Sequence, residues 1–366
     1  MPAHHPTRLR ASCLLLLALA LVPRGLLAAM PDAAWAASLQ PGQTVQLPAG
    51  NYRGPWTIGP RVHLIASPGA TLEGGETTLT IRGNGVTVEG LLVRASPRGV
   101  GIAAEDAFGV ALLEVHVVGG TRGIVMHRGS LSLRGGGVAH TSQFGVWLQG
   151  CDATISSLEL ADHRGSALYL AHTRARIDHL HITRTEYGLL AFHSRFELKA
   201  SRIAETSRTG AGVILSSGSI EETLFDGPFS EAALSISGAH PLRIRGNRIV
   251  RAGSIGIKLL NSTASLSQNL ISGARSDAQG LEGDGLYANN SQIDSDGDRI
   301  LDNGGAAVSV MGGRAAIRGC MIQGAGQAAA AVASQGVLTL SGCEISNGST
   351  DLVATPGATI SRSETP

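Results

Sequence analysis

The feature that most constrains the fold is an internal repeat of roughly 22 residues, which runs from residue 86 almost to the end of the chain. Each unit holds a short strand-like alternation of apolar and polar residues, a bend at small or polar residues, and a second apolar strand about eight residues later. Alternating segments of this kind recur at GVTVEGLLV (85–93), DATISSLEL (152–160), ARIDHLHI (175–182), LRIRGNRIV (242–250), ASLSQNLI (264–271), AAIRGCMI (315–322) and VLTLSGCEI (337–345). Such a period is typical of solenoids, in which every repeat adds one coil.

Strands this short cannot bury a face by themselves. If each strand stacks on the same strand of the preceding coil, about 4.8 Å away, every backbone N–H and C=O group finds a partner. Inward side chains then form columns of like residues. The sequence therefore predicts an all-β solenoid of about 12 coils with parallel strands.

Composition agrees with a solenoid and excludes some functions. The chain has 366 residues, 49 of them glycine, with only 4% aromatic and 16% charged residues. Layers of small and branched aliphatic side chains, with glycine at corners, can build a core from such a composition. Because the formal net charge is only +1, we expect no binding to nucleic acid.

The N-terminus has the pattern of an export signal. Arg8 and Arg10 precede a short apolar run at residues 13–22, and small residues follow, so cleavage after Ala29 or after Ala36 is expected. The run is short for a bilayer span, although an uncleaved anchor is the alternative. We expect a secreted or periplasmic protein without a membrane span in the mature chain.

The sequence divides into four regions on this interpretation. They are a signal peptide (1–36), an N-terminal cap with the first coils (37–85), the regular repeats (86–358) and a C-terminal tail (359–366). Residues 32–39 (DAAWAASL) lack strand alternation, and a helix there would cover the exposed first coil. Trp35, Trp56 and Trp147 are far apart in the sequence, so we expect cap or surface packing from each rather than a sugar-stacking platform.

Aligning the coils predicts one inward column that changes from aliphatic to small and polar. Asn247 and Asn269 would form an amide ladder in it. Cys320 and Cys343 would be neighbours, either as a disulfide or as buried thiols. The column runs through Val115, Leu158, Leu180, Ser201, Thr223, Asn247, Asn269, Asp298, Cys320 and Cys343. A turn column of His140, Asp162, Arg184, Glu205 and Arg251 has alternating charges and is expected to be a surface ladder rather than a catalytic site.

Two segments resemble a known superfamily. The stretch GQTVQLPAGNYRGPWTIGPRVHLIASPGATLEGG (42–75), followed by LTIRGNGVTVEGLLV (79–93), resembles the opening of the pectate-lyase-like β-helix proteins. Later coils such as GNRIVRAGSIGIKLLNSTASLSQNLISG (246–273) look like the repeats of that superfamily. The resemblance implies a single-stranded right-handed parallel β-helix. It also implies relatives among polysaccharide lyases, alginate C5-epimerases and periplasmic proteins of copper-enzyme maturation.

The catalytic motifs of these relatives are missing from the sequence. It contains no Asp-Pro-His-Asp of alginate epimerases, no Trp-Ile-Asp-His of pectate lyases, and neither the Asn-Thr-Asp nor the Gly-His-Gly of polygalacturonases. No catalytic residue of the superfamily can therefore be assigned to a position in this chain. One fold hosts many activities.

An outward column of basic residues is the candidate substrate-binding surface. Cations and imidazoles one coil apart could follow the carboxylates of a uronic-acid chain, with a spacing close to one sugar per coil. We predict substrate binding by His116, His181, Arg202 and Arg248, in a column that also holds Glu159 and Arg299. The alternative is an ordinary solvated face.

A cluster of aspartates is the candidate metal site. Alternating acidic residues in IDSDGDRILDNGG (293–305) suit the hard oxygen ligands of calcium. The pattern matches an EF-hand loop only in part, since Arg299 and Gly305 replace its glycine and its glutamate. The predicted ligands are Asp284, Asp294, Asp296, Asp298 and Asp302. The alternative is a solvated acidic turn with Asp298 in the polar ladder; no other cofactor is expected.

Three functions remain open at the level of the sequence. The first is binding of an acidic polysaccharide, with cleavage or epimerisation of the lyase or C5-epimerase type if the protein is an enzyme. The second is a structural or adhesive surface protein without catalysis, and the third is metal handling in the periplasm. A monomer is expected in each case.

Overall fold

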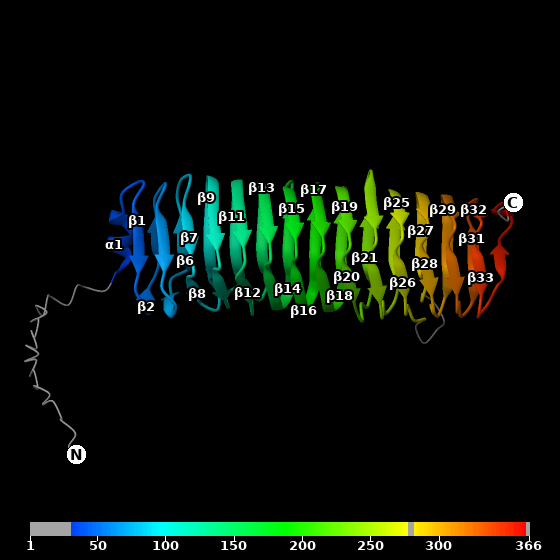
Figure 1. Cartoon of the computed structure of the whole chain (residues 1–366), viewed down its shortest axis with the longest axis horizontal. Coiled ribbons are helices and arrows are strands. Elements are labelled where there is room, and N and C mark those ends of the chain that lie inside the picture. Colours follow the sequence, from blue (N-terminus) through cyan, green and yellow to red (C-terminus); the bar gives the residue numbers. More distant parts are fainter. Residues whose placement is uncertain (1–30, 277–281, 364–366) are drawn as a thin grey trace, which may run out of the picture. The chain divides into compact units, whose positions relative to one another are not determined.

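The structure is a computed structural model that describes residues 31–276 and 282–363. One short helix, α1 (Ala33–Ser38), precedes 35 strands that belong to one continuous parallel sheet. The sheet winds through about 14 turns, and the coils stack side by side in sequence order (Figure 1). The all-β solenoid is therefore confirmed, with slightly more coils than the 12 expected.

The strands fall into an irregular first part and a regular remainder. The first part contains β1 (Thr44–Leu47), β2 (Gly50–Arg53), β3 (Trp56–Ile58), β4 (His63–Ala66), β5 (Ala70–Glu73), β6 (Thr77–Ile81), β7 (Thr87–Glu89) and β8 (Leu92–Arg94). The central coils contain β9 (Val100–Leu113), β10 (His116–Val118), β11 (Arg122–Arg134), β12 (Gly137–Ala139), β13 (Phe144–Ser156), β14 (Glu159–Ala171), β15 (Arg174–Asp178), β16 (His181–Phe192), β17 (Arg195–Lys199), β18 (Arg202–Ile214), β19 (Ser217–Glu221), β20 (Leu224–Asp226), β21 (Ala232–Ser237), β22 (Leu242–Arg245) and β23 (Arg248–Val250). The last coils contain β24 (Ile257–Leu260), β25 (Thr263–Ser267), β26 (Leu270–Ser272), β27 (Leu286–Asp296), β28 (Arg299–Leu301), β29 (Ala306–Arg318), β30 (Met321–Gln323), β31 (Ala328–Ala333), β32 (Val337–Ser341), β33 (Glu344–Ser346), β34 (Leu352–Ala354) and β35 (Thr359–Ser363).

Each regular coil has three faces, which we name A, B and C. In one central coil, face A is formed by residues 159–161 and face B by residues 166–171, both within β14, and face C is formed by β15. Outward and inward side chains alternate along each face, as the burial pattern of β15 shows. Every face thus presents columns of side chains that are one coil, or rung, apart.

The corners between faces need left-handed backbone. At the corner from A to B, His140, Asp162, Arg184, Glu205 and Arg251 all have φ between 52° and 60°. These are the residues of the predicted turn column, which is confirmed as a stack of left-handed turn residues. Asp162 binds Arg184 of the next coil at 2.7 Å, so part of the column is also a charge ladder.

The corner from C to A contains the predicted polar ladder. The side chains of Ser201, Thr223, Asn247 and Asn269 are buried and each accepts a hydrogen bond from a backbone N–H of the preceding coil. Asn269 in turn donates to Asp298. These side chains satisfy backbone groups that the turn leaves unpaired in the strand ladder. Cys320 and Cys343 continue the column as buried free thiols.

The helix α1 covers the first coil. Asp32 caps its N-terminus by accepting a hydrogen bond from the backbone N–H of Trp35 at 2.8 Å. The ring of Trp35 lies 5.3 Å from that of Trp56, which is fully buried. The cap therefore shields the apolar end of the core from water.

The stack begins within the region expected to hold the first coils and continues into the region expected to be a tail. β1 already pairs with β4, and β35 pairs with β32 inside the region expected to be a tail. Residues 1–30 of the predicted signal peptide (1–36) lie outside the described residues. Among the described residues, no helix combines the length and hydrophobicity needed to cross a membrane.

Candidate functional site

The predicted basic column exists as one outward column on face A. Strand register joins His116, Gly137, Glu159, His181, Arg202, Leu224, Arg248, Leu270, Arg299, Met321 and Glu344 on successive rungs. The four predicted binding residues are all exposed. Leucine and methionine interrupt the basic residues, so the column carries isolated cations rather than a continuous basic strip.

The charges of this column differ in how they are paired. Arg202 forms an ion pair with Asp226 at 3.1 Å, and Asp226 also pairs with Arg251. His116, His181 and Arg248 form no ion pair among the described residues. Arg202 is therefore partly neutralised, and substrate binding by all four residues stays a prediction.

The five predicted calcium ligands lie in different parts of the coils. Asp294 and Asp296 point outward from face C, while Asp298 is buried in the inward ladder. Burial raises the pKa of Asp298 and of Asp284 above the usual range, although hydrogen bonds oppose the shift. Asp284 accepts a hydrogen bond from the backbone of Ala306, and Asp302 has the left-handed backbone of a turn.

These positions do not converge on one centre. Among residues 31–276 and 282–363, no three His, Cys, Asp or Glu side chains form a group able to hold a metal ion. Calcium binding therefore remains a prediction from the sequence pattern. A calorimetric titration with calcium, repeated with Asp294→Asn, tests it directly.

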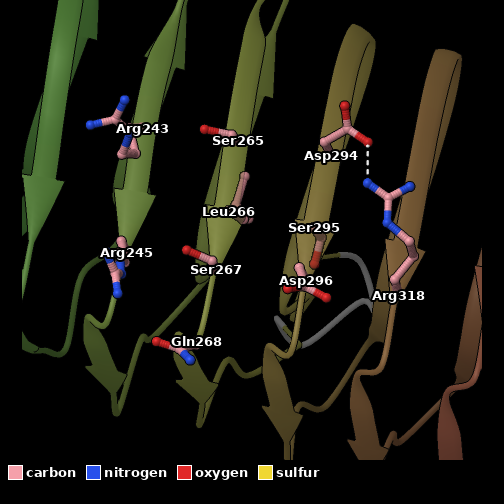
Figure 2. A pocket seen from close by; sticks show the side chains of 10 residues that line it. All are labelled: Arg243, Arg245, Ser265, Leu266, Ser267, Gln268, Asp294, Ser295, Asp296 and Arg318. Carbon is pink, nitrogen blue, oxygen red and sulfur yellow. Dashed lines mark hydrogen bonds and ion pairs between the residues drawn. The ribbon is translucent and has the colours of Figure 1, made fainter.

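The outer surface of face C contains a hollow of about 420 Å³ at the acidic stretch. Figure 2 shows it between an arginine rung and an aspartate rung, with a serine rung between them. Asp294 is joined to Arg318 on the next rung, with 2.9 Å between Oδ1 and Nη2. The hollow is lined by Arg243, Arg245, Ser265, Leu266, Ser267, Gln268, Asp294, Ser295, Asp296 and Arg318.

Face B carries a feature that the sequence analysis did not foresee. Trp147 and Tyr169 lie on adjacent rungs of its central outward column, with ring centroids 6.1 Å apart. Phe144 contacts both, at 5.3 and 5.2 Å, and Phe192 lies 5.4 Å from Tyr169. We call Phe144, Trp147, Tyr169 and Phe192 the aromatic row. All four are half-buried, so each shows part of its ring to solvent.

One arginine contacts the aromatic row, and a second arginine contacts a tyrosine outside the row on the same face. The guanidinium of Arg122 lies 5.0 Å from the ring of Trp147, and that of Arg208 lies 5.0 Å from the ring of Tyr187. Arg208 also pairs with Glu186 and Glu231 on the rungs before and after it. Burial acts to raise the pKa of Glu231, but hydrogen bonds from Thr209 and Arg208 lower it below the usual value.

A depression extends from the row toward the N-terminal coils. His127, whose ring lies 5.2 Å from Trp147, is one wall of a hollow of about 700 Å³. Its floor includes Thr80, Ala103 and Val125, which precede Trp147 in the same outward column. On face B, the surface formed by these small side chains is therefore continuous with the aromatic row.

The aromatic row adds tyrosine and phenylalanine neighbours that the expectation of cap or surface packing for the three tryptophans did not include. Trp35 and Trp56 do pack in the cap, but Trp147 belongs to a cluster with tyrosine and phenylalanine. The four residues of the row all fall within residues 144–192 and share one face, in a chain that is only 4% aromatic. Placing all aromatic residues, and not only tryptophan, on the coil alignment would have found this signal.

The chemistry available at face B is that of a binding surface. Aromatic rings offer flat apolar areas to the C–H groups of a sugar ring, while neighbouring polar groups can bind its hydroxyls. A guanidinium stacked on an aromatic ring keeps N–H groups free at its edge. Arg208 and Thr209 hold Glu231 and thereby favour its ionised form.

Comparison with solved structures finds proteins similar in fold. A siphovirus 9NA tailspike receptor-binding domain is 10% identical over 85% of this chain and 72% of its own, with a TM-score of 0.49. The periplasmic alginate epimerase AlgG is 12% identical over 85% and 86%, with a TM-score of 0.45. A PL6 alginate lyase in complex with a trisaccharide is 12% identical over 86% and 81%, also with a TM-score of 0.45.

A search of curated proteins found no significant match. The family model described as "right handed beta helix region" matches residues 122–315, more than half of the chain. This match covers the aromatic row and most of the residues of the basic column and of the hollow on face C. With its parallel coils and polar ladder, the chain belongs to the right-handed β-helix family.

Proposed function

We propose that this protein binds a polysaccharide along the outer surface of face B. The observation that carries the proposal is the aromatic row, in which four rings of adjacent coils contact one another and remain partly open to solvent. Partly exposed aromatic rings are costly to leave in water unless a partner covers them. A sugar chain supplies such a partner, because its rings have apolar and polar faces.

The spacing of the row suits a polymer. Trp147 and Tyr169 occupy adjacent rungs, and rungs repeat at about 4.8 Å. This spacing is close to one sugar per rung for a chain that runs along the solenoid. The depression lined by Thr80 and Val125 would extend the same path beyond His127.

Arg122 favours an acidic polysaccharide. Its guanidinium lies over Trp147 and forms no ion pair among the described residues. A carboxylate of a sugar stacked nearby would give it a charge-assisted hydrogen bond. The basic column of His116, His181, Arg202 and Arg248 lies on face A, beyond a corner of the coil, so a straight chain on face B would not reach it.

We propose binding at this surface without catalysis. Glu231, on the same face, is paired with Arg208 and accepts a hydrogen bond from Thr209. These contacts lower the pKa of Glu231, which makes it a poor proton donor at neutral pH. If the predicted export signal acts, the surface would face polysaccharides outside the cytoplasm.

Affinity electrophoresis through gels that contain alginate, pectate, hyaluronan, xylan or dextran tests the proposal. We expect retardation by at least one acidic polymer, and a weakening of about tenfold in the variant Trp147→Ala, since losing one stacked ring removes about 1–2 kcal/mol of binding. Phe108→Ala is the matched control, because Phe108 is an exposed aromatic residue that makes no ring contact with the row. Equal loss in both variants, or no retardation by any polymer, would refute the proposal.

A further inference from the structure

We propose that the hollow on face C is a second carbohydrate site, which takes a short oligosaccharide with one acidic sugar joined to neutral sugars. This site is independent of the polysaccharide surface on face B. Three successive rungs that differ in side-chain length and in charge form its floor and walls, and Arg318 of the next rung also lines it (Figure 2).

The shape of the hollow comes from its serine rung. Ser265 and Ser267 follow Arg243 and Arg245 in register, and Asp294 and Asp296 follow the serines. The short side chains of the serine rung leave a floor between two rungs with longer side chains. The hydroxyls of Ser265 and Ser267 make no hydrogen bond within the described residues, so both can bind sugar hydroxyls.

The two walls carry opposite charges, and each wall has one charged side chain without a partner among the described residues. The side chains of Arg245 and Asp296 form no ion pair or hydrogen bond in the described part of the chain. Arg243 reaches Glu221 only at 3.9 Å, and Asp294 has a firm partner in Arg318. One arginine and one aspartate therefore remain available on opposite sides of the floor.

The order of the charges selects the ligand. A sugar carboxylate would bind at the arginine rung, where guanidinium N–H groups can donate to it. Two rungs further, roughly 10 Å away, Asp296 can accept hydrogen bonds from sugar hydroxyls but would repel a second carboxylate. A ligand with one acidic sugar and neutral neighbours fits both walls, whereas a homopolymer of uronic acid fits only one.

Saturation-transfer NMR and calorimetry with two probes test this site. The first probe is xylotriose that carries one glucuronic acid, and the second is tetragalacturonate, which has the same number of sugars with four carboxylates. We expect the first probe to bind about tenfold more tightly. Arg245→Gln should weaken its binding to a similar extent, and Arg299→Gln, which removes an exposed arginine of face A, should have no effect.

Two further variants distinguish binding in the hollow from attraction by charge alone and from binding on face B. Ser265→Ile with Ser267→Val fills the floor while every charge stays, so binding should be lost if the hollow is the site and kept if charge alone attracts the probe. Trp147→Ala should leave binding of the first probe unchanged, even if polysaccharide binding on face B fails. Absence of binding to the unmodified protein, or unchanged binding after filling the floor, would overturn the inference.

Discussion

Asp298 is the buried acceptor that ends the polar ladder of Asn269. Its Oδ1 accepts hydrogen bonds from the backbone N–H of Asn269 at 2.7 Å and from the side-chain amide at 2.8 Å. Its other oxygen accepts a hydrogen bond from Ser295. The side chain is fully buried, so the ladder contains a carboxyl group where another amide would make most of the same contacts.

Replacing this carboxyl by an amide should stabilise the protein at neutral pH. Burial raises the pKa of Asp298 in the folded state, so its contribution to stability is greatest at low pH and is lost as the pH rises through the folded pKa. In urea unfolding at pH 7, we expect Asp298→Asn to raise the free energy of unfolding by about 1 kcal/mol. The gain should shrink toward pH 4, where the carboxyl approaches its protonated form.

Removing the acceptor altogether should have the opposite effect. Asp298→Ala leaves two N–H donors of Asn269 unpaired in the core, which costs about 1–3 kcal/mol. The same urea unfolding experiment measures this loss. A variant as stable as the unmodified protein would show that the ladder does not depend on its last member.

A buried histidine should make the protein sensitive to acid. The Nδ1 of His163 lies 2.8 Å from Oγ1 of Thr141 and also accepts the backbone N–H of Thr141, while its Nε2 is buried without a partner among the described residues. Burial lowers the pKa of His163 to about 4, although Asp162 acts to raise it.

The pH window follows from these values. Below pH 6.5, the unfolded chain binds a proton at this histidine that the folded chain binds only near pH 4, so stability falls between these pH values and levels off below them. The loss should approach about 3 kcal/mol. The free energy of unfolding should be measured between pH 6.5 and pH 4 for the unmodified protein and for His163→Asn, which should not show the loss. If the free energies of the two proteins change by the same amount over this range, the prediction is wrong.

Signal processing should spare the helix that caps the first coil. Cleavage after Ala36 would cut α1 inside its range, remove Trp35 and expose Trp56, which is fully buried. We therefore expect cleavage after Ala29, with a mature chain that begins at Met30. Intact-mass measurement of the exported protein checks this cleavage site.

Loss of the Trp35 ring should destabilise the fold, because this ring packs on Trp56. In urea unfolding, we expect Trp35→Ala to lower the free energy of unfolding by about 2 kcal/mol.

The columns of the solenoid could be predicted because the period of the chain fixes them. Asn247 and Asn269 are 22 residues apart, and the structure places them on adjacent rungs. The basic column of face A was equally accessible, since His181 and Arg202 fall at the same point of successive repeats. Where coil length is constant, counting residues is enough.

The aromatic row, our proposed binding surface, was harder to predict because coil length varies. The register between β14 and β16 shifts between His163 and Ser166, so counting 22 residues from Tyr169 arrives one residue past Leu190, its true neighbour. The aromatic row also spans more than one outward column of face B, so no single column reveals it. Such contacts depend on the three-dimensional stacking of the rungs.

The acidic stretch illustrates a second limit. Its spacing resembles a metal-binding loop, yet strand alternation turns Asp294 and Asp296 outward and the corner turns Asp298 inward. Asp302 lies beyond another corner. Side chains at the same sequence separation thus point in different directions in a strand and in a loop. The sequence pattern alone could not show which of the two structures forms here.

Tryptophan fluorescence during titration with an acidic polysaccharide tests the central claim most directly. Trp35 and Trp56 belong to the cap, whereas Trp147 lies in the aromatic row. We predict a saturable change in emission for the unmodified protein and none for Trp147→Phe, which keeps a ring for binding but loses the reporter. An equal change in both proteins, or no change with any polymer that the gels retain, would contradict binding at face B.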